Sequence, residues 1–538
     1  MCVSLVNPRE FLQRFSVLSS AIQDLHSGEA VFSLDNFGRL FSQHTLQLRH
    51  CNVTPCDTTQ KTILWSSPDQ FRTQVSSQLF QRAYRSSPCP PQVARWLFQM
   101  MSVHSDKLTC HQVLKALGDI ACSAAEHMVL NKSERYEVWV PSVGDVTLVF
   151  MNMGVPFVTL FPLENLQPPF TEGDLIEGIQ ISTESLSSKK LRTFPEHNFD
   201  NVIKYMCHCT SLCPRAYSDR DLLLLLTVVS RVGLDTQLAL QPTEHLRSLL
   251  HNLVNSIRDL DSMLPRICMS LVDLTEDHHN LRWLVELLPD SMRGKQLRRH
   301  ISVSAISKLL NKKCTYIPSN TEFQLSDLRP YLSRMRPSSL LRGLATSCSR
   351  RSPHPHRERE GEEEVEDCAS LDQQAYYLCY SLLALANEAT NFEFFPSEQK
   401  NQLLLLSAEL EKHIKSDIRE SEKMLYRSKV KDFVARIYTK WQVMVHRTRP
   451  LQGKLYDYWQ PLPEDAVSSS QESQHSHRER EVAEERGERV MEVEGEEDEG
   501  DEVGQDGEGQ DKEERTPEKH YAMEEAEERK DIQGEEED

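Results

Sequence analysis

The chain has 538 residues, of which 39% are hydrophobic and 26% charged, and its formal net charge is −20. This length exceeds one core of typical size, so we expect several folded units. The longest apolar run, residues 222–229, is far shorter than the roughly 20 residues of a membrane span. The 14 cysteines are spread too thinly for a secreted disulfide scaffold. Both observations favour an intracellular, soluble protein with reduced thiols and no membrane partner.

Residues 1–130 are predicted to form an N-terminal helical part. Asn7 and Pro8 are typical of a helix start, and apolar residues then recur at helical spacing as far as residue 25. Two further helices are expected at residues 92–103 and 109–123.

Residues 131–195 differ in composition from the helical part before them. From Tyr136 the segment YEVWVPSVGDVTLVFMNMGVPFVTLFP is rich in Val, Phe and Thr and is punctuated by Gly and Pro. This composition favours two or three short strands, so we expect a β-containing insertion followed by a polar loop.

Residues 196–345 return to a helical pattern. Ser218 and Asp221 form a capping box, and an apolar stripe at spacings of three and four runs from Leu246 to Leu264 and is expected to end at Pro265. Further helices are predicted at residues 278–288 and 291–310.

A linker is expected at residues 346–369 and C-terminal helices at residues 370–460. Ser370 with Gln373 is typical of a helix cap, and the absence of Gly and Pro between Pro396 and Pro450 predicts one long helix or two stacked ones. Within them, aromatic and aliphatic residues from Phe433 to Val445 keep the helical period and should be buried.

Residues 461–538 are predicted to be a disordered acidic tail. Residues 479–538 hold 28 acidic and 8 basic side chains, a net of −20, so the other 53 acidic and 53 basic residues of the chain cancel. The sequence therefore predicts a mainly α-helical protein, a HEAT-like solenoid with a small β-containing insertion and a disordered acidic C-terminal tail.

The candidate chemical motifs are weak. Cys207, His208, Cys209 and Cys213 resemble a metal site, but the first spacer is one residue long and no second pair follows, which favours ordinary thiols over zinc. The adjacent His278 and His279 would point about 100° apart on a helix, which favours a structural role. No P-loop, dinucleotide fingerprint, HExxH or GxSxG motif is present, so we expect no enzyme, no catalytic residues, no cofactor and no metal.

Two basic blocks stand out against the neutral body. Residues 291–351 hold 13 Lys or Arg against 2 acidic residues, and residues 423–454 hold 9 against 1. Such surfaces could bind phosphates or an acidic partner, or could be solvated helix faces. The candidate interaction or DNA face comprises Arg293, Lys295, Arg298, Arg299, Lys312, Lys313, Lys429, Lys431 and Arg436.

Long blocks of the chain resemble the CANIN-domain family. They are LPRICMSLVDLTEDHHNLRWLVELLPDSMRGKQLRRHISVSAISKLL from Leu264, DQQAYYLCYSLLALANEATNFEFFPSEQKNQ from Asp372, and GKLYDYW from Gly453. The resemblance covers roughly residues 65–460, and the acidic tail is not associated with the family pattern.

The resemblance implies a nuclear adaptor without enzymatic activity in the DNA damage response. Family members are expected to act on chromatin in DNA repair, bringing the Smc five/six complex to damaged DNA together with a partner localisation factor that carries BRCT and ankyrin repeats. The family supplies no catalytic motif to transfer. The alternative from a different class is a stand-alone DNA-binding scaffold that uses the basic helical faces.

Overall fold

Helices form all the named regular elements of the described part of the chain. The structure, a computed structural model, describes residues 21–22, 28–130, 135–177, 179, 193–238, 241–319, 322–351, 361–421 and 423–447. These residues belong to one compact unit, Met1–Leu451. The predicted mainly α-helical fold is confirmed. The predicted acidic tail, the GKLYDYW block and most of the first predicted helix lie outside the described residues.

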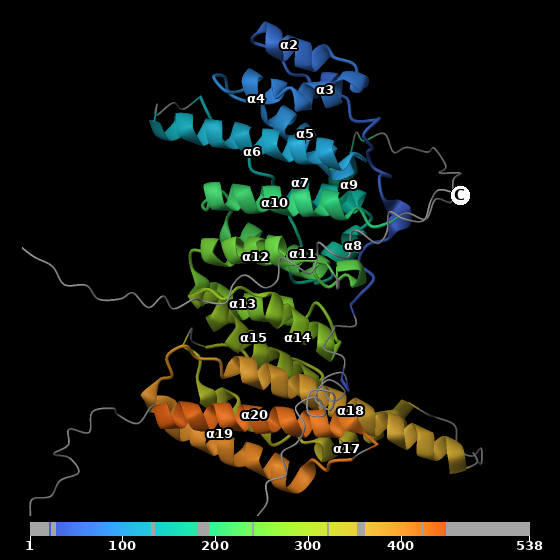
Figure 1. Ribbon diagram of the computed structural model, residues 1–538, viewed down its shortest axis with the longest axis vertical. Helices are drawn as coiled ribbons and strands as arrows, with labels where there is room; N and C mark the ends of the chain where they lie inside the picture. The colour runs from blue at the N-terminus through green and yellow to red at the C-terminus, as the bar shows by residue number, and fades with distance from the viewer. Residues whose placement is uncertain are drawn as a thin grey trace, which may run out of the picture. The chain divides into compact units, whose positions relative to one another are not determined.

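Consecutive helices of this unit pack against one another in an order close to that of the sequence (Figure 1). The N-terminal group is α2 (Thr58–Trp65), α3 (Phe71–Ser76), α4 (Leu79–Ala83), α5 (Pro91–Val103) and α6 (Lys107–Leu130). The central group is α10 (Glu196–Leu212), α11 (Asp219–Val232), α12 (Glu244–Ser256), α13 (Leu260–Val272), α14 (His278–Leu287) and α15 (Met292–Asn311). The C-terminal group is α16 (Arg329–Leu332), α17 (Pro337–Arg351), α18 (Gly361–Ala389), α19 (Lys400–Lys412) and α20 (Leu425–Arg447).

The expected β-containing insertion is wrong for the described residues, because residues 143–176 hold α7 (Val143–Asn152), α8 (Phe157–Leu160) and α9 (Glu172–Ile176). A capping box starts α7: the Asp145 amide donates to Ser142 Oγ at 3.1 Å, and the Ser142 amide donates to Asp145 Oδ2 at 3.0 Å. Nearly every side chain of α7 is buried. An apolar run enclosed on all sides suits a helix, and its burial overrides the strand preference of Val, Phe and Thr.

Two predicted helix boundaries are also wrong. The apolar stripe belongs to two helices, α12 and α13, and Pro265 lies inside α13, where it removes one backbone hydrogen bond while buried neighbours such as Leu264 and Ile267 hold the helix in place. Ser370 does not cap a helix, because α18 begins at Gly361. The region before Pro450 forms two helices, α19 and α20, as one of the two predicted options.

The buried face predicted for the last helix is confirmed at four positions, whereas Phe433 and Tyr438 are half-buried. Val434, Ile437, Trp441 and Val445 of α20 are buried, and the Trp441 indole donates to Thr390 Oγ1 at 2.9 Å. This contact fixes α20 against the end of α18.

A mostly irregular segment near the N-terminus, residues 28–48, which includes the short 3-10 helix η1 (Leu34–Asn36), lies across several of these helices and is called the strap below. The Asp235 carboxylate accepts hydrogen bonds from the Val31 and Phe32 amides, both at 2.8 Å. Asn152 Oδ1 accepts from the amides of Leu40 and Phe41 at 2.9 and 3.0 Å. Backbone groups add to these contacts: the amides of Glu29 and Ser33 donate to the carbonyls of Leu234 and Gly154 at 2.9 and 3.0 Å. Side chains and backbone of the helical body together thus satisfy the polar groups of this segment.

The chain just before the strap reaches the C-terminal helices. Lys429 Nζ on α20 donates to the Ile22 carbonyl at 2.6 Å, and the Tyr377 hydroxyl on α18 donates to the Ala21 carbonyl at 3.3 Å. Residues 21–22 therefore contact α18 and α20, and the strap contacts α7. Figure 1 shows the described part of the strap, in blue, running beside the helical body.

Candidate interaction surfaces

The first four candidate basic residues lie at the start of α15 and contact this chain. Arg293 Nη1 donates to the carbonyls of Ile257 and Asn255 at 2.6 and 3.0 Å. Lys295 Nζ forms an ion pair with Glu393 at 2.8 Å. Both cations thus hold α15 against neighbouring segments.

Arg298 and Arg299 each make several contacts within the chain. Arg298 is 9% exposed, pairs with Asp290 at 2.7 Å and donates from Nε to the Leu288 carbonyl at 2.9 Å. The Arg299 guanidinium donates to the Asn391 carbonyl and lies 4.5 Å from the ring centre of Phe392. Arg298 thus fastens α15 to the segment before it, and Arg299 fastens α15 to the loop after α18.

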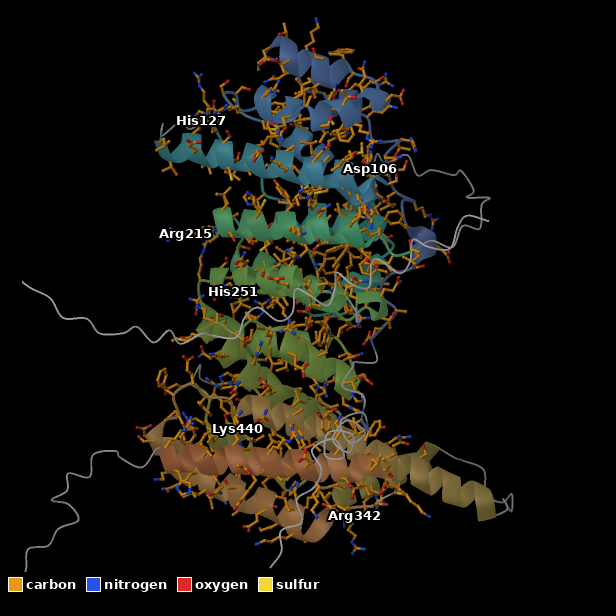
Figure 2. The ribbon with its side chains drawn as sticks, viewed as in Figure 1. Asp106, His127, Arg215, His251, Arg342 and Lys440 are labelled. Carbon is orange, nitrogen blue, oxygen red and sulfur yellow. The ribbon has the colours of Figure 1, made fainter. Side chains whose placement is uncertain are left out.

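The second basic block behaves similarly. Lys429 is buried against the Ile22 carbonyl, Lys431 pairs with Glu420 at 3.1 Å, and Arg436 pairs with Asp432 at 2.7 Å. Lys440, which belongs to the same block and is labelled in Figure 2, donates to Asn387 at 3.0 Å.

Lys312 and Lys313, at the end of α15, are exposed. Of the nine candidate residues, seven thus contact partners within the chain, and Lys312 and Lys313 do not appear in those contacts and are exposed. Their role toward another molecule stays a prediction.

Beside α15 lies a groove of about 670 Å³, called the α15 groove. Lys295 and Arg299 line it, together with Met292 and Phe394, whose side chains are 88% and 86% exposed. Its far wall is fixed by Gln399, which accepts from the Leu325 amide at 2.7 Å and donates to the Phe323 carbonyl at 3.0 Å. The groove thus has a rigid wall and exposed apolar anchors, which are features of protein-binding surfaces.

Sequence reasoning did not single out Met292 and Phe394. A lone Met at a helix start and a Phe in a loop carry no periodic signal, and the groove forms only when α15 meets the loop after α18. The run of positive charge did mark one of its walls.

The cysteine cluster has no metal-binding geometry. Cys209 is buried, and burial raises the pKa of its thiol to about 12. Cys207 Sγ lies 3.4 Å from Asn252 Nδ2, and His208 Nε2 lies 3.6 Å from Cys122 Sγ. No group of three or more potential metal ligands occurs among the residues that the structure describes.

The histidine pair belongs to a helix contact. Asp277 caps α14 by accepting from the amides of His279 and Asn280, both at 2.9 Å. His278 Nδ1 lies 2.8 Å from Ser381 Oγ on α18, and burial, followed by the neighbouring His279, lowers the His278 pKa to about 4. A neutral ring at this position suits packing between α14 and α18.

None of the described helices combines the length and apolar character that a bilayer crossing requires. The described part of the chain combines packed helices with an open groove lined by exposed apolar side chains, an arrangement typical of scaffolds for protein partners. The family that the comparisons show agrees with this class. The model of the Coiled-coil and Nse Interacting (CANIN) domain matches residues 4–315, and the chain belongs to this family, which consists of adaptor-type proteins.

The match starts before the expected residue 65 and ends well before residue 460. Among curated relatives, the zebrafish "SMC5-SMC6 complex localization factor protein 2" is 54% identical over 472 residues, which cover 87% of this chain and 40% of the relative. The human protein of the same name is 39% identical over 84% of this chain and 38% of its own length. The human "Protein FAM178B" is 28% identical, over 84% of this chain and 64% of the relative. The chain thus spans less than two thirds of each.

Proposed function

We propose that the chain is a non-enzymatic nuclear adaptor that helps recruit the SMC5-SMC6 complex to damaged DNA. The observation that carries the proposal is the 54% identity, over most of this chain, to a localization factor of that complex. The partner localisation factor with BRCT and ankyrin repeats, which the family resemblance implies, would bind a second face of the same helical array.

In this function the helices work as a solenoid-like scaffold rather than as a catalyst. Several contacts on one rigid support raise the effective concentration of the bound complex at a lesion, and no single contact has to be strong. The long-range hydrogen bonds of Asp235, Asn152 and Lys429 support such a rigid array, because they connect the N-terminal residues with parts of the helical body far along the sequence.

The α15 groove is the surface that we assign to a subunit of the SMC5-SMC6 complex. Exposed Met292 and Phe394 would each be buried on binding, and burial of a large apolar side chain is worth about 1.5–3 kcal/mol. The Lys295–Glu393 ion pair, partly exposed at the groove, supplies polar groups of both signs at the rim.

Binding of the full chain to the purified SMC5-SMC6 complex tests the proposal. The double variant Met292→Asp/Phe394→Asp should weaken binding at least tenfold, because it places two charges on a surface that must be desolvated. Both side chains are exposed, so the fold should be retained.

Val158→Asp serves as the matched control, because Val158 is also an exposed apolar residue, at 71%, and lies outside the groove. It should bind like wild type. Failure of the wild-type chain to bind the complex would refute the proposed function, whereas binding that the double variant leaves unchanged would refute only the assignment of the groove.

A further inference from the structure

Where α6 packs against α10, a cysteine thiol and a histidine ring from distant parts of the sequence lie together. Cys122 Sγ on α6 is 3.6 Å from His208 Nε2 on α10, which is within hydrogen-bond distance for sulfur. Cys122 is exposed and His208 is half-buried. The fold thus presents a thiol–imidazole pair to solvent.

Gly118 gives the His208 ring its place on α6. Gly118 lies one helical turn before Cys122, so the two positions share one face of the helix. A Cβ atom at Gly118 would lie 3.9 Å from His208 Nε2, an ordinary contact distance. The imidazole therefore packs onto the surface of α6, and this packing keeps Nε2 at the thiol.

Most other thiols of the described residues are protected by burial. A thiol must ionise to attack as a nucleophile, and burial disfavours the charged thiolate. Burial raises the thiol pKa at Cys51, Cys89, Cys110, Cys207, Cys209, Cys213, Cys268, Cys314 and Cys379. At Cys89, Cys110 and Cys209 the pKa rises to about 12. The exposed thiols among the described residues are those of Cys56 and Cys122.

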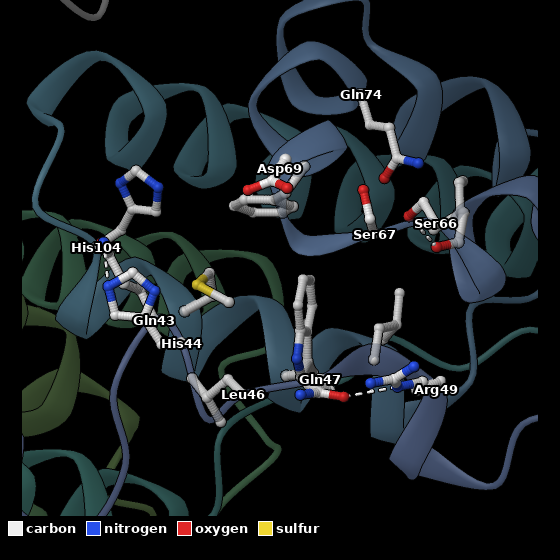
Figure 3. A pocket seen from close by; sticks show the side chains of 15 residues that line it. Gln43, His44, Leu46, Gln47, Arg49, Ser66, Ser67, Asp69, Gln74 and His104 are labelled. Carbon is white, nitrogen blue, oxygen red and sulfur yellow. Dashed lines mark hydrogen bonds between the residues drawn. The ribbon is translucent and has the colours of Figure 1, made fainter. Parts of the chain in front are cut away.

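A second histidine lies beside a cysteine but is arranged differently. His104 lines a cavity of about 190 Å³ among the N-terminal helices (Figure 3). Its Nδ1 accepts from the Asp106 amide at 3.1 Å, whereas Cys110 Sγ donates to the His104 backbone carbonyl at 3.1 Å. This ring does not receive the thiol proton, and Cys110 is buried. In the described part of the chain, an exposed thiol meets an imidazole at Cys122.

We propose that Cys122 is a modification site at which His208 acts as the base and the co-substrate is a low-molecular-weight disulfide. His208 Nε2 accepts the thiol proton, and Sγ attacks one sulfur of the disulfide. A new S–S bond to Cys122 forms as the old S–S bond breaks, and the departing half leaves as a thiolate that takes the proton from His208. Cys122 is oxidised and the departing half is reduced, so no further oxidant is needed.

The modification site is separate from the surface assigned to the SMC5-SMC6 complex. Neither Cys122 nor His208 lines the α15 groove. The inference therefore does not depend on the proposed adaptor function, and each can fail without the other.

Glutathione disulfide added to the folded full chain tests the inference, with the rate at each cysteine followed by peptide mapping in a mass spectrometer. Cys122 should form the mixed disulfide about tenfold faster than Cys56, or more. Cys56 is the internal control, because it is equally classed as exposed and its contact is through the backbone amide, which donates to Gln60 Oε1 at 2.9 Å. The fully buried Cys268 and Cys379 should stay unmodified, which reports that the chain remains folded.

The variant His208→Gln keeps a polar side chain of similar reach but removes the base. It should lower the rate at Cys122 about tenfold and leave the rate at Cys56 unchanged. His251→Gln, at an exposed histidine of α12, is the matched control and should leave both rates unchanged.

Two results would overturn the inference. One is equal rates at Cys122 and Cys56 in the wild-type chain, a comparison that decides the matter even if His208→Gln fails to fold. The other is a rate at Cys122 that His208→Gln leaves unchanged while Cys268 stays unmodified. Binding to the SMC5-SMC6 complex is measured separately and decides the proposed function.

Discussion

Buried polar side chains of the helical body hold the strap in place. Asn152 and Asp235 are fully buried and Asn280 is 1% exposed, yet each pairs with strap backbone. Left without these amides, a buried carboxylate such as that of Asp235 would be strongly destabilising. The three residues show no pattern in the sequence, because their partners lie between 111 and 252 positions away.

His413 gives the unfolding free energy a specific dependence on pH. Its side chain is fully buried at the end of α19, Nε2 lies 3.1 Å from the Leu332 carbonyl, and burial, followed by the charge of Arg336, lowers its pKa to about 4. An unfolded histidine titrates near pH 6.5. Below that pH the unfolded chain takes up a proton that the folded chain refuses, so stability falls between about pH 6.5 and pH 4.

The loss in unfolding free energy that His413 causes should reach about 3 kcal/mol at pH 4, because its pKa is about 2.5 lower in the folded chain than in the unfolded one. His413→Phe should reduce the dependence across this interval in urea unfolding but not abolish it, because His278, whose pKa burial also lowers to about 4, contributes over the same interval. The variant also lowers stability at pH 7 by removing the contact with Leu332. His251→Phe, at an exposed position of α12 labelled in Figure 2, should keep the wild-type dependence. Parallel curves for wild type and His413→Phe would contradict the prediction.

At the scale of elements, local signals predicted helices well wherever a cap and an apolar stripe coincided. The capping box of Ser218 and Asp221 starts α11, and α14 and α15 lie within a residue or two of their expected ranges. The prediction failed for α7, where strand-type residues are enclosed on all sides by the rest of the protein, and it missed the strap, which has no periodic pattern of its own. Both features depend on tertiary contacts that the local sequence does not encode.

The sequence also predicted only part of the candidate site. Positive charge marked the start of α15, but which cations remain available depends on partners such as Glu393 and Asn391, nearly a hundred residues away. The apolar anchors of the α15 groove have no signal beyond their own side chains.

The contact of the strap with Gly154, just after α7, can be tested by a pair of glycine substitutions. Gly154 follows α7 with φ +106°, and a Cβ there would lie 2.2 Å from the Ser33 carbonyl oxygen. Gly154→Ala should therefore destabilise the protein by about 3 kcal/mol or more in urea unfolding, from backbone strain and displacement of the strap.

Gly343→Ala is the control of opposite sign. Gly343 lies inside α17, and among the described residues no atom from outside its own helix turn lies within 4 Å of the position of an added Cβ, so alanine should stabilise the protein by about 1 kcal/mol. Equal stability of the Gly154→Ala variant and wild type would show that the strap does not rest against Gly154.

For the whole molecule, the distribution of charge argues against strong non-specific binding to DNA. Outside residues 479–538 the chain holds 53 acidic and 53 basic residues, so the body has no net positive field. Seven of the nine candidate cations already have partners within the chain, such as Asp290 for Arg298 and Glu420 for Lys431. Phosphates would have to compete with those partners.

The dependence of DNA binding on salt distinguishes the adaptor from the stand-alone DNA-binding scaffold. If Lys312 and Lys313 alone of the nine contact phosphates, the logarithm of affinity should fall with the logarithm of salt concentration with a slope no steeper than about −2, whereas nine contacts would give about −8. The double variant Lys312→Ala/Lys313→Ala should remove most of this slope, measured by fluorescence anisotropy with duplex DNA. Lys61→Ala/Lys115→Ala, at exposed positions of α2 and α6, should leave it unchanged. A slope near −8 would instead mean that phosphates displace the internal ion pairs, and it would favour direct DNA binding as the function of the basic helices.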